Sequence, residues 1–528
     1  MSSSFFLHFS CIYPGYFMYC SIRTTLIQGI RAVPVQVEVD ISNGMPVFDM
    51  VGNLSSEVKE AKERVKTALH NCGIAMPAKR ITVNLTPAHI RKSGTGFDLP
   101  LAVALLCGVG VIEAEAVKDI VFVGELNLKG EILPVKGILP IVYDEKNRGY
   151  DKFVIPWDNY NEARLISGAH ISGVKNIEQA IELLQGREID KPTENQKERK
   201  TGKNLDFSQV NGQKFIKRAC EVSASGMHNI LVVGPPGAGK TMIAERMPSI
   251  LPPLTYDEEL EIAKIYSVCG MLDKDTAFSH VRPFRSPHNT ITQAGLIGGG
   301  LGLKPGEISL AHNGVLFLDE LSEFKKGLAD LLRQPMEEKC IHLERGTRSV
   351  AYPSKFLFFG AMNPCNCGYY PDMQKCTCSM PTIQRYIEKI SQPLLDRIDI
   401  CVEAQSLSYS DISENRENES SDIIRKRVME CHRIQADRYQ KENFYYNSDI
   451  PASLLDRYCS LGSKESTYMA KMYDKMGMTA RTYHRILRVA RTIADLDQSD
   501  KISLKHISEA VCYRSIRDKY WGGNFYEV

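Results

Sequence analysis

The chain has 528 residues, of which 43% are hydrophobic and 24% charged, with a formal net charge of +2. This composition is typical of a soluble globular protein with more than one domain, and the small net charge excludes a protein that is basic overall. The 15 cysteines are odd in number and spread along a long chain, which excludes a small disulfide scaffold and favours reduced thiols in a cytoplasmic protein.

The amino-terminal segment does not have the pattern of a signal peptide. It lacks a basic region, and His8, Ser10 and Pro14 interrupt its apolar run. We expect residues 1–20 to be a disordered tail. The alternative is that the start codon is assigned too early and that Met18 is the true start. The sequence contains no stretch of about 20 consecutive apolar residues, so we expect no membrane span.

Two long blocks follow, separated by a charged segment. Residues 21–185 alternate strand-like runs such as RITVNLT with amphipathic helical runs, an α+β or α/β pattern. Residues 186–204 are highly charged, and Pro192 and Gly202 favour an interdomain linker over a solvated helix. Residues 205–400 alternate strands and helices again, and residues 401–528 are mostly helical.

The strongest motif lies in the second block. The apolar strand NILVVG leads into GPPGAGKT and then into a helical run, which matches G-x-x-x-x-G-K-[ST] in the required strand–loop–helix context. We predict that Lys240 contacts the β- and γ-phosphates of ATP and that Thr241 ligates Mg²⁺. The predicted nucleotide-binding residues of the loop are Gly234, Pro235, Pro236, Gly237, Ala238, Gly239, Lys240 and Thr241.

Two further apolar strands end in polar residues. VLFLDE ends at Asp319 and Glu320, and FLFFGAMN ends at Asn363. We predict that Asp319 holds Mg²⁺, that Glu320 polarises the attacking water and that Asn363 senses the γ-phosphate. The alternative for Asn363 is a turn-forming residue before Pro364.

Residues 206–400 resemble the AAA+ ATPases of the helix-2-insert branch, which includes magnesium-chelatase subunits. The resemblance extends to PLLDRIDI and TARTYHRIL. It implies a ring in which Arg397 acts on the neighbouring subunit's γ-phosphate, with a salt bridge as the alternative. It also implies that Arg481, in a helical lid, is a second sensor, unless this residue faces solvent. Gln213 would lie near the adenine.

Two stretches resemble hairpins inserted in this branch. GGGLGLKPGE precedes the strand of Asp319, and a pair of short strands around RGTR precedes the strand of Asn363. In helicase relatives such hairpins contact DNA phosphates, which makes Lys304, Arg345 and Arg348 candidate DNA contacts. Ordinary surface turns are the alternative.

The first block resembles the Lon protease domain through RKSGTGFDLPLAVALLCGVGV and ILPVKGIL. Gly96 and Leu139 stand where Lon proteins have the catalytic Ser and Lys, and Lys92, Ser93 and Lys136 are nearby but displaced. We therefore predict a Lon-like fold that is not a protease, with a rearranged dyad as the alternative.

The order of these parts resembles the ComM/YifB family of magnesium-chelatase-related proteins. The expected fold is thus a multidomain α/β protein with a Lon-like α+β domain, an AAA+ P-loop core and a helical lid. The family implies a hexameric ATPase and DNA helicase that promotes branch migration of DNA during natural transformation. The alternative is a chelatase-like ATPase that remodels a protein partner.

Four cysteines follow Asn363 in the pattern C-x-C-x8-C-x-C. Four thiolates can hold one structural Zn²⁺, although C-x-C is tighter than the usual C-x2-C spacing. A redox sensor or free thiols in a packed loop are the alternatives. The residues concerned are Cys365, Cys367, Cys376 and Cys378.

Overall fold

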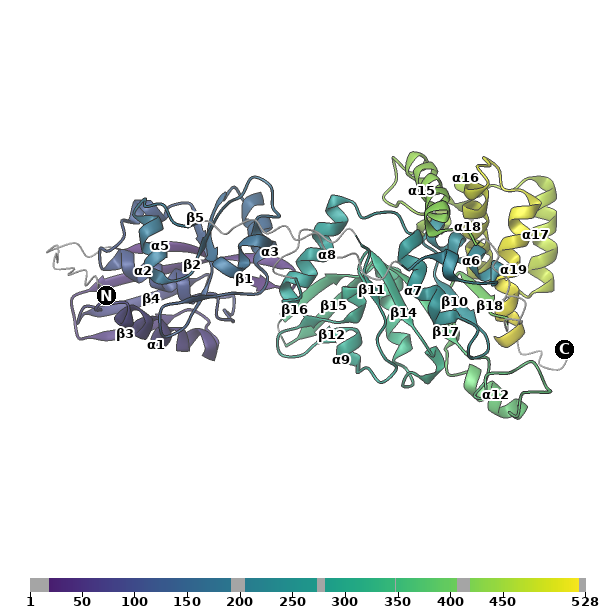
Figure 1. The fold of residues 1–528 in the computed structure, drawn as a ribbon, viewed down its shortest axis with the longest axis horizontal. Coiled ribbons are helices and arrows are strands. Elements are labelled where there is room, and N and C mark those ends of the chain that lie inside the picture. Colours follow the sequence, from purple (N-terminus) through teal and green to yellow (C-terminus); the bar gives the residue numbers. More distant parts are fainter. Residues whose placement is uncertain (1–18, 191–204, 273–280, 347, 406–417, 522–528) are drawn as a thin grey trace. The chain divides into compact units, whose positions relative to one another are not determined.

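The computed structural model describes residues 19–190, 205–272, 281–346, 348–405 and 418–521 (Figure 1). Nearly all of the predicted tail and most of the predicted linker lie outside these ranges. The chain divides into two compact units, the first of residues 1–199 and 263–278 and the second of residues 200–262 and 279–528. No helix in the described ranges has the length and apolarity that crossing a membrane requires.

The first unit is built on a seven-stranded mixed sheet. Strand β2 pairs antiparallel with both of its neighbours, β1 and β4. The other neighbouring pairs, β3–β4, β1–β5, β5–β8 and β8–β9, are parallel. In sheet order, the strands are β3 (Val47–Val51), β4 (Arg80–Thr86), β2 (Arg31–Ser42), β1 (Cys20–Gln28), β5 (Ile120–Phe122), β8 (Lys152–Pro156) and β9 (His170–Val174).

The helices of this unit pack an apolar core against the sheet. All of α2 is buried, including Asp98, whose carboxylate accepts two hydrogen bonds of 2.9 Å from Arg64. That pairing offsets the cost of burying a charge in an apolar helix. The elements are α1 (Ser56–Asn71), α2 (Asp98–Gly108), α3 (Ile138–Asn147), α4 (Tyr160–Ala163), α5 (Ile177–Leu184) and the small hairpin of β6 (Glu125–Leu126) and β7 (Ile132–Leu133).

Helix α8 (Tyr256–Cys269) begins in the second unit, but its carboxyl half belongs to the first. There the Ser267 carbonyl accepts a 3.1 Å hydrogen bond from the Gly137 N–H, and the Lys264 ammonium lies 3.1 Å from the centroid of the Tyr143 ring. The alternation of strands and helices along the sequence predicts this helix wholly within the 205–400 block.

The second unit contains a five-stranded parallel sheet. Every residue of β10, β14 and β17 is buried, as expected for parallel strands covered on both faces. Because the strands are parallel, their carboxyl ends meet at one edge of the sheet. In sheet order they are β11 (Phe284–Arg285), β14 (Gly314–Leu318), β17 (Phe356–Met362), β10 (Ile230–Val233) and β18 (Ile400–Glu403).

Short helices and two antiparallel hairpins connect these strands. The hairpins are β12 (Gly298–Gly299) with β13 (Lys304–Pro305) and β15 (Cys340–Arg345) with β16 (Arg348–Pro353). The helices are α6 (Lys214–Gly226), α7 (Lys240–Ile250), α9 (Gln293–Leu296), α10 (Glu307–Leu310), α11 (Arg333–Glu338), α12 (Met380–Ile387) and α13 (Gln392–Leu395).

The carboxyl-terminal helices, which we call the lid, pack beside β18 (Figure 1). They share one hydrophobic core with the sheet. The Thr479 hydroxyl caps α18 by accepting from the Thr482 N–H, so Arg481 lies in the first turn of that helix. The lid helices are α15 (Ser421–Arg438), α16 (Leu455–Tyr458), α17 (Ser463–Lys475), α18 (Ala480–Leu496) and α19 (Leu504–Trp521).

Candidate active site

The glycine-rich loop lies between β10 and α7, at the edge where the parallel strands end. Gly237 and Gly239 have φ values of 76° and 81°, a left-handed conformation that glycine adopts without strain. This conformation points successive backbone N–H groups toward one side, at the positive end of α7. The loop therefore has the backbone geometry that cradles phosphate oxygens.

Lys240 is 8% exposed, and its ammonium has three acceptors. It donates to the carbonyls of Gly234 at 2.7 Å and Pro235 at 2.8 Å, and to Asn363 Oδ1 at 3.0 Å. Burial lowers the pKa of Lys240 to about 8, although the carboxylates of Asp319 and Glu320 oppose this shift. A buried ammonium beside a glycine-rich loop suits the phosphates of a nucleotide.

The carboxyl end of β14 carries the two predicted acidic residues. The Thr241 hydroxyl donates a 2.6 Å hydrogen bond to Asp319 Oδ2. A hydroxyl and a carboxylate oxygen at this spacing can both ligate Mg²⁺, which prefers oxygen donors and keeps several waters. The metal and nucleotide residues predicted from separate motifs thus lie together.

Glu320 adopts a left-handed backbone conformation with φ of 50°. Asn289 Nδ2 donates a 3.2 Å hydrogen bond to Glu320 Oε2, which fixes the carboxylate that would polarise water. The sequence analysis did not identify Asn289. No sequence signal points to Asn289, because its position beside Glu320 depends on the pairing of β11 with β14.

Gln213 stands at the amino end of α6 and bridges two parts of the nucleotide site. Its Nε2 donates to the Ala238 carbonyl at 3.2 Å and to the Gln405 carbonyl at 2.6 Å. The side chain therefore connects the glycine-rich loop with the residues that follow β18. Contact with adenine stays a prediction.

Arg397 follows α13 and contacts residues other than those around Lys240. Its guanidinium pairs with Glu337 Oε1 at 2.6 Å and donates to the carbonyls of Arg333 at 3.1 Å and Pro393 at 2.6 Å. The salt bridge given as the alternative role is thus present. A role toward a neighbouring subunit stays a prediction.

Arg481 is exposed on the lid, whereas another arginine of the same helix contacts the core. Arg485 pairs with Asp399, which is 7% exposed and also accepts a 3.2 Å hydrogen bond from the Asn229 N–H. Burial acts to raise the pKa of Asp399, but Arg485 and His228 outweigh it and hold that pKa well below its usual range. Nothing in the local sequence predicts this pair.

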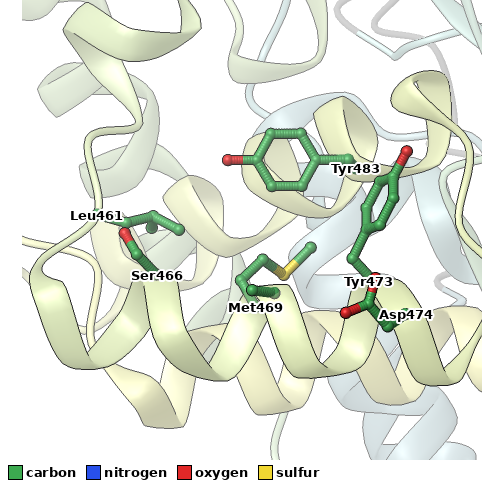
Figure 2. A pocket seen from close by; sticks show the side chains of 7 residues that line it. Leu461, Ser466, Met469, Tyr473, Asp474 and Tyr483 are labelled. Atoms are coloured by element: carbon green, nitrogen blue, oxygen red, sulfur yellow. The ribbon is translucent and has the colours of Figure 1, made fainter.

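The lid also contains a pocket of about 340 Å³ between α17 and α18. Figure 2 shows the rings of Tyr473 and Tyr483 on one side of Met469; their centroids are 6.3 Å apart. None of the predicted nucleotide-binding residues lines this pocket.

The two inserted hairpins are joined. The Tyr352 hydroxyl of β16 donates a 2.8 Å hydrogen bond to the carbonyl of Leu303, in the turn of the other hairpin. Lys304 lies in β13, and Arg345 and Arg348 pair across the end of the second hairpin. Lys304 and Arg345 are exposed, and Arg348 is half-buried.

The four cysteines gather in the loop between β17 and α12. Their sulfurs all lie within 4.8 Å of one another, and the structure contains no disulfide among them. The arrangement fits a single thiophilic metal ion.

The positions compared with Lon lie in the first unit. Leu139 is fully buried in α3. Lys92 is also fully buried, and its ammonium donates to the Pro87 carbonyl rather than to Ser93. Burial lowers the pKa of Lys92. The Lon-like fold and the absence of protease activity stay predictions.

Comparison with known families covers most of the chain. Profiles described as "Magnesium chelatase, subunit ChlI", "Subunit ChlI of Mg-chelatase" and "Magnesium chelatase, subunit ChlI C-terminal" match residues 206–412, 37–159 and 418–514. A likeness to Lon protease 2 of Bacillus subtilis is shorter, with 25% identity over 140 residues, 26% of this chain and 24% of that protein.

Two relatives match along almost their full length. The competence protein ComM of Haemophilus influenzae is 39% identical over 496 residues, covering 92% of this chain and 96% of that protein. The protein YifB of Escherichia coli is 38% identical over 501 residues, covering 94% of this chain and 97% of that protein. Together with the P-loop site, these matches point to an AAA+ ATPase of the magnesium-chelatase type. The chain belongs to the ComM/YifB family of magnesium-chelatase-related proteins.

Proposed function

We propose that this protein is a ring-forming, cytoplasmic ATPase that moves branched or single-stranded DNA, with branch migration during natural transformation as its role. The observation that carries the proposal is the joined pair of hairpins with Lys304, Arg345 and Arg348 in the same unit as the ATP site. Lys304 and Arg345 are exposed, and exposed cations on hairpins suit the phosphates of a DNA strand.

The ATP chemistry is assigned to the residues at the edge of the parallel sheet. Lys240 would neutralise phosphate charge, and Thr241 and Asp319 would hold a magnesium ion, which would stabilise the negative charge of the phosphates. Glu320, oriented by Asn289, polarises the attacking water. Asn363, which accepts a hydrogen bond from Lys240, would orient the same water.

Ring formation is proposed from Arg397. The groups that it contacts, Glu337, Arg333 and Pro393, are not among the nucleotide-binding residues of its own chain. The Arg397 side chain is 11% exposed, and an arginine at this position can supply positive charge to the transition state in a neighbouring subunit. A hexamer is the expected ring.

The proposal is tested by the binding of a four-way DNA junction and by ATP hydrolysis with and without it. We expect junction DNA to stimulate hydrolysis. Arg345→Ala with Arg348→Ala should weaken DNA binding by about 10- to 100-fold, since each lost phosphate contact costs about 1 kcal/mol. Arg433→Ala removes an exposed arginine of α15, which pairs with Glu430, and should leave DNA affinity unchanged.

The magnesium-chelatase profiles favour one alternative, an ATPase that remodels a protein partner. One result would reject the DNA motor: ATP hydrolysis that Lys240→Ala abolishes but whose rate no tested DNA changes. That result would favour the partner-remodelling function.

A further inference from the structure

The four cysteine sulfurs have the spacing of a tetrahedral metal site. Cys365 Sγ lies 3.3 Å from Cys367 Sγ and 3.8 Å from Cys376 Sγ, and the last two are 3.6 Å apart. With Zn–S bonds of about 2.3 Å, a regular tetrahedron has sulfur–sulfur edges of about 3.8 Å. The loop therefore needs only a small adjustment to surround one Zn²⁺.

Backbone hydrogen bonds hold the loop in this shape. The Gly368 N–H donates to the Cys365 carbonyl at 3.0 Å, and the Cys376 N–H donates to the Asp372 carbonyl at 2.8 Å. Backbone groups of Tyr369 and Thr377 also hydrogen-bond to the Cys367 sulfur. Two turns thus present the cysteine pairs to each other, which is how short metal-binding loops stabilise thiolates.

The same loop contacts the glycine-rich phosphate loop. A Cβ atom placed on Gly368 would lie 2.5 Å from Pro236 Cδ, so the two backbones meet closely at this point. Tyr369 and Tyr370 line a pocket of about 440 Å³ together with Pro235 and Gln405. The cysteine loop is therefore packed against the backbone that would cradle phosphates.

The loop also contacts the lid. The rings of Tyr370 and Tyr520 have centroids 6.2 Å apart and meet edge to face. The Tyr520 hydroxyl, on α19, donates a 2.6 Å hydrogen bond to Glu403 Oε1 at the end of β18. One short loop thus touches the phosphate loop on one side and the last lid helix on the other.

We propose that Cys365, Cys367, Cys376 and Cys378 hold one structural Zn²⁺, and that the zinc-bound loop fixes the phosphate loop relative to α19. Four sulfur ligands fill a tetrahedral site and leave no position for water, so the ion has no part in hydrolysis. Binding releases the thiol protons to solvent. The link to nucleotide affinity rests on the proposed ATP site, whereas the metal content does not.

The first test measures metal in the full chain, purified under reducing conditions without chelator. We expect about one zinc per chain, falling below about 0.1 in Cys376→Ser with Cys378→Ser. Cys512→Ser changes an exposed cysteine of α19 outside the cluster and should keep the zinc. Wild-type protein that contains no zinc and takes up none on addition of Zn²⁺ would overturn the site.

A reversible version guards against misfolding of the serine variants. Chelator should lower the melting temperature of the wild-type chain, and added Zn²⁺, but not Mg²⁺, should restore it. A melting temperature that chelator leaves unchanged in zinc-containing protein would overturn the structural role.

The second test compares two glycine variants. Gly368→Ala places a methyl group against Pro236, whereas Gly327→Ala imposes a similar backbone strain, φ of 81° against 85°, where nothing lies within 4 Å. We expect Gly368→Ala to keep its zinc and to bind a fluorescent ATP analogue about 10-fold more weakly than Gly327→Ala, a difference of about 1.4 kcal/mol.

The readouts separate the two proposals. Equal affinity in the two glycine variants would overturn the coupling between the cysteine loop and the phosphate loop. A wild-type chain that holds zinc but binds no nucleotide would instead refute the ATP site and, with it, the coupling.

Discussion

The contact between Arg485 of the lid and Asp399 of the core offers a quantitative test of how the lid is held. Arg485 is 18% exposed at its side chain and Asp399 6%. Arg485→Ala leaves a buried carboxylate whose neighbours include His228, the Asn229 N–H and the charge of Arg488. Removing one partner of a buried pair costs about 3–5 kcal/mol, and we expect the lower end because Arg485 retains some contact with water.

The charge on Asp399 accounts for most of this cost. In an Asp399→Asn background the same Arg485→Ala change removes one hydrogen bond to a neutral amide, worth about 1 kcal/mol. The double-mutant cycle should therefore give a coupling energy of about 2 kcal/mol. Because the pKa of Asp399 is lowered in the folded protein, the contribution is complete above about pH 5 and shrinks as the pH falls below about 4.

Urea unfolding can be followed in the second unit alone. The chain has two tryptophans, and Trp521 lies in α19, where its Nε1 donates to the Ile387 carbonyl. A Trp157→Phe background removes the other one. Arg433→Ala, in an exposed pair with Glu430, is the matched control and should change nothing measurable. A cost for Arg485→Ala no larger than the control, or a cycle without coupling, would refute the reasoning.

Three further predictions concern the ATP site. Glu320→Gln should still bind ATP but hydrolyse it about 10²- to 10⁴-fold more slowly in single-turnover assays, and unchanged turnover would reject Glu320 as the base. Arg397→Ala should lower steady-state turnover by about 10³-fold or more without weakening nucleotide binding, and normal turnover would exclude its role in a neighbouring subunit. Since the pKa of Lys240 is about 8, ATP binding should take up nearly one proton at pH 9 and almost none at pH 6.5. Calorimetry in two buffers measures this uptake, and its persistence in Lys240→Arg would assign the proton to another group.

The parts of the site that a continuous segment encodes could be predicted from the sequence. The phosphate-loop motif is eight consecutive residues, and the structure places the last two, Lys240 and Thr241, in the first turn of α7. Asp319 and Glu320 could be predicted because an apolar strand that ends in two carboxylates follows the phosphate loop along the chain. The local sequence carries both the conformation and the chemistry in these cases.

Contacts between distant segments could not be predicted in the same way. Asn289 meets Glu320 because β11 pairs with β14, and a two-residue strand has no periodicity to reveal it. Arg481 and Arg485 lie one helical turn apart, and only the packing of α18 decides that Arg485 contacts Asp399. The carboxyl half of α8 likewise belongs to the first unit through contacts that its amphipathic pattern leaves unspecified.

The two hairpins and the ATP chemistry lie at opposite ends of the same strands. The first hairpin leads through α10 into β14, whose far end carries Asp319, and the second leads into β17, whose far end precedes Asn363. The seven residues of β17 span about 23 Å at 3.3 Å each. Because the Tyr352–Leu303 hydrogen bond joins the hairpins, a shift of either strand along its axis would move both. Lys304 and Arg345 would then keep a constant separation during the movement. The length of a step along a bound DNA strand would therefore be set by the displacement of the sheet rather than by two loops that move independently.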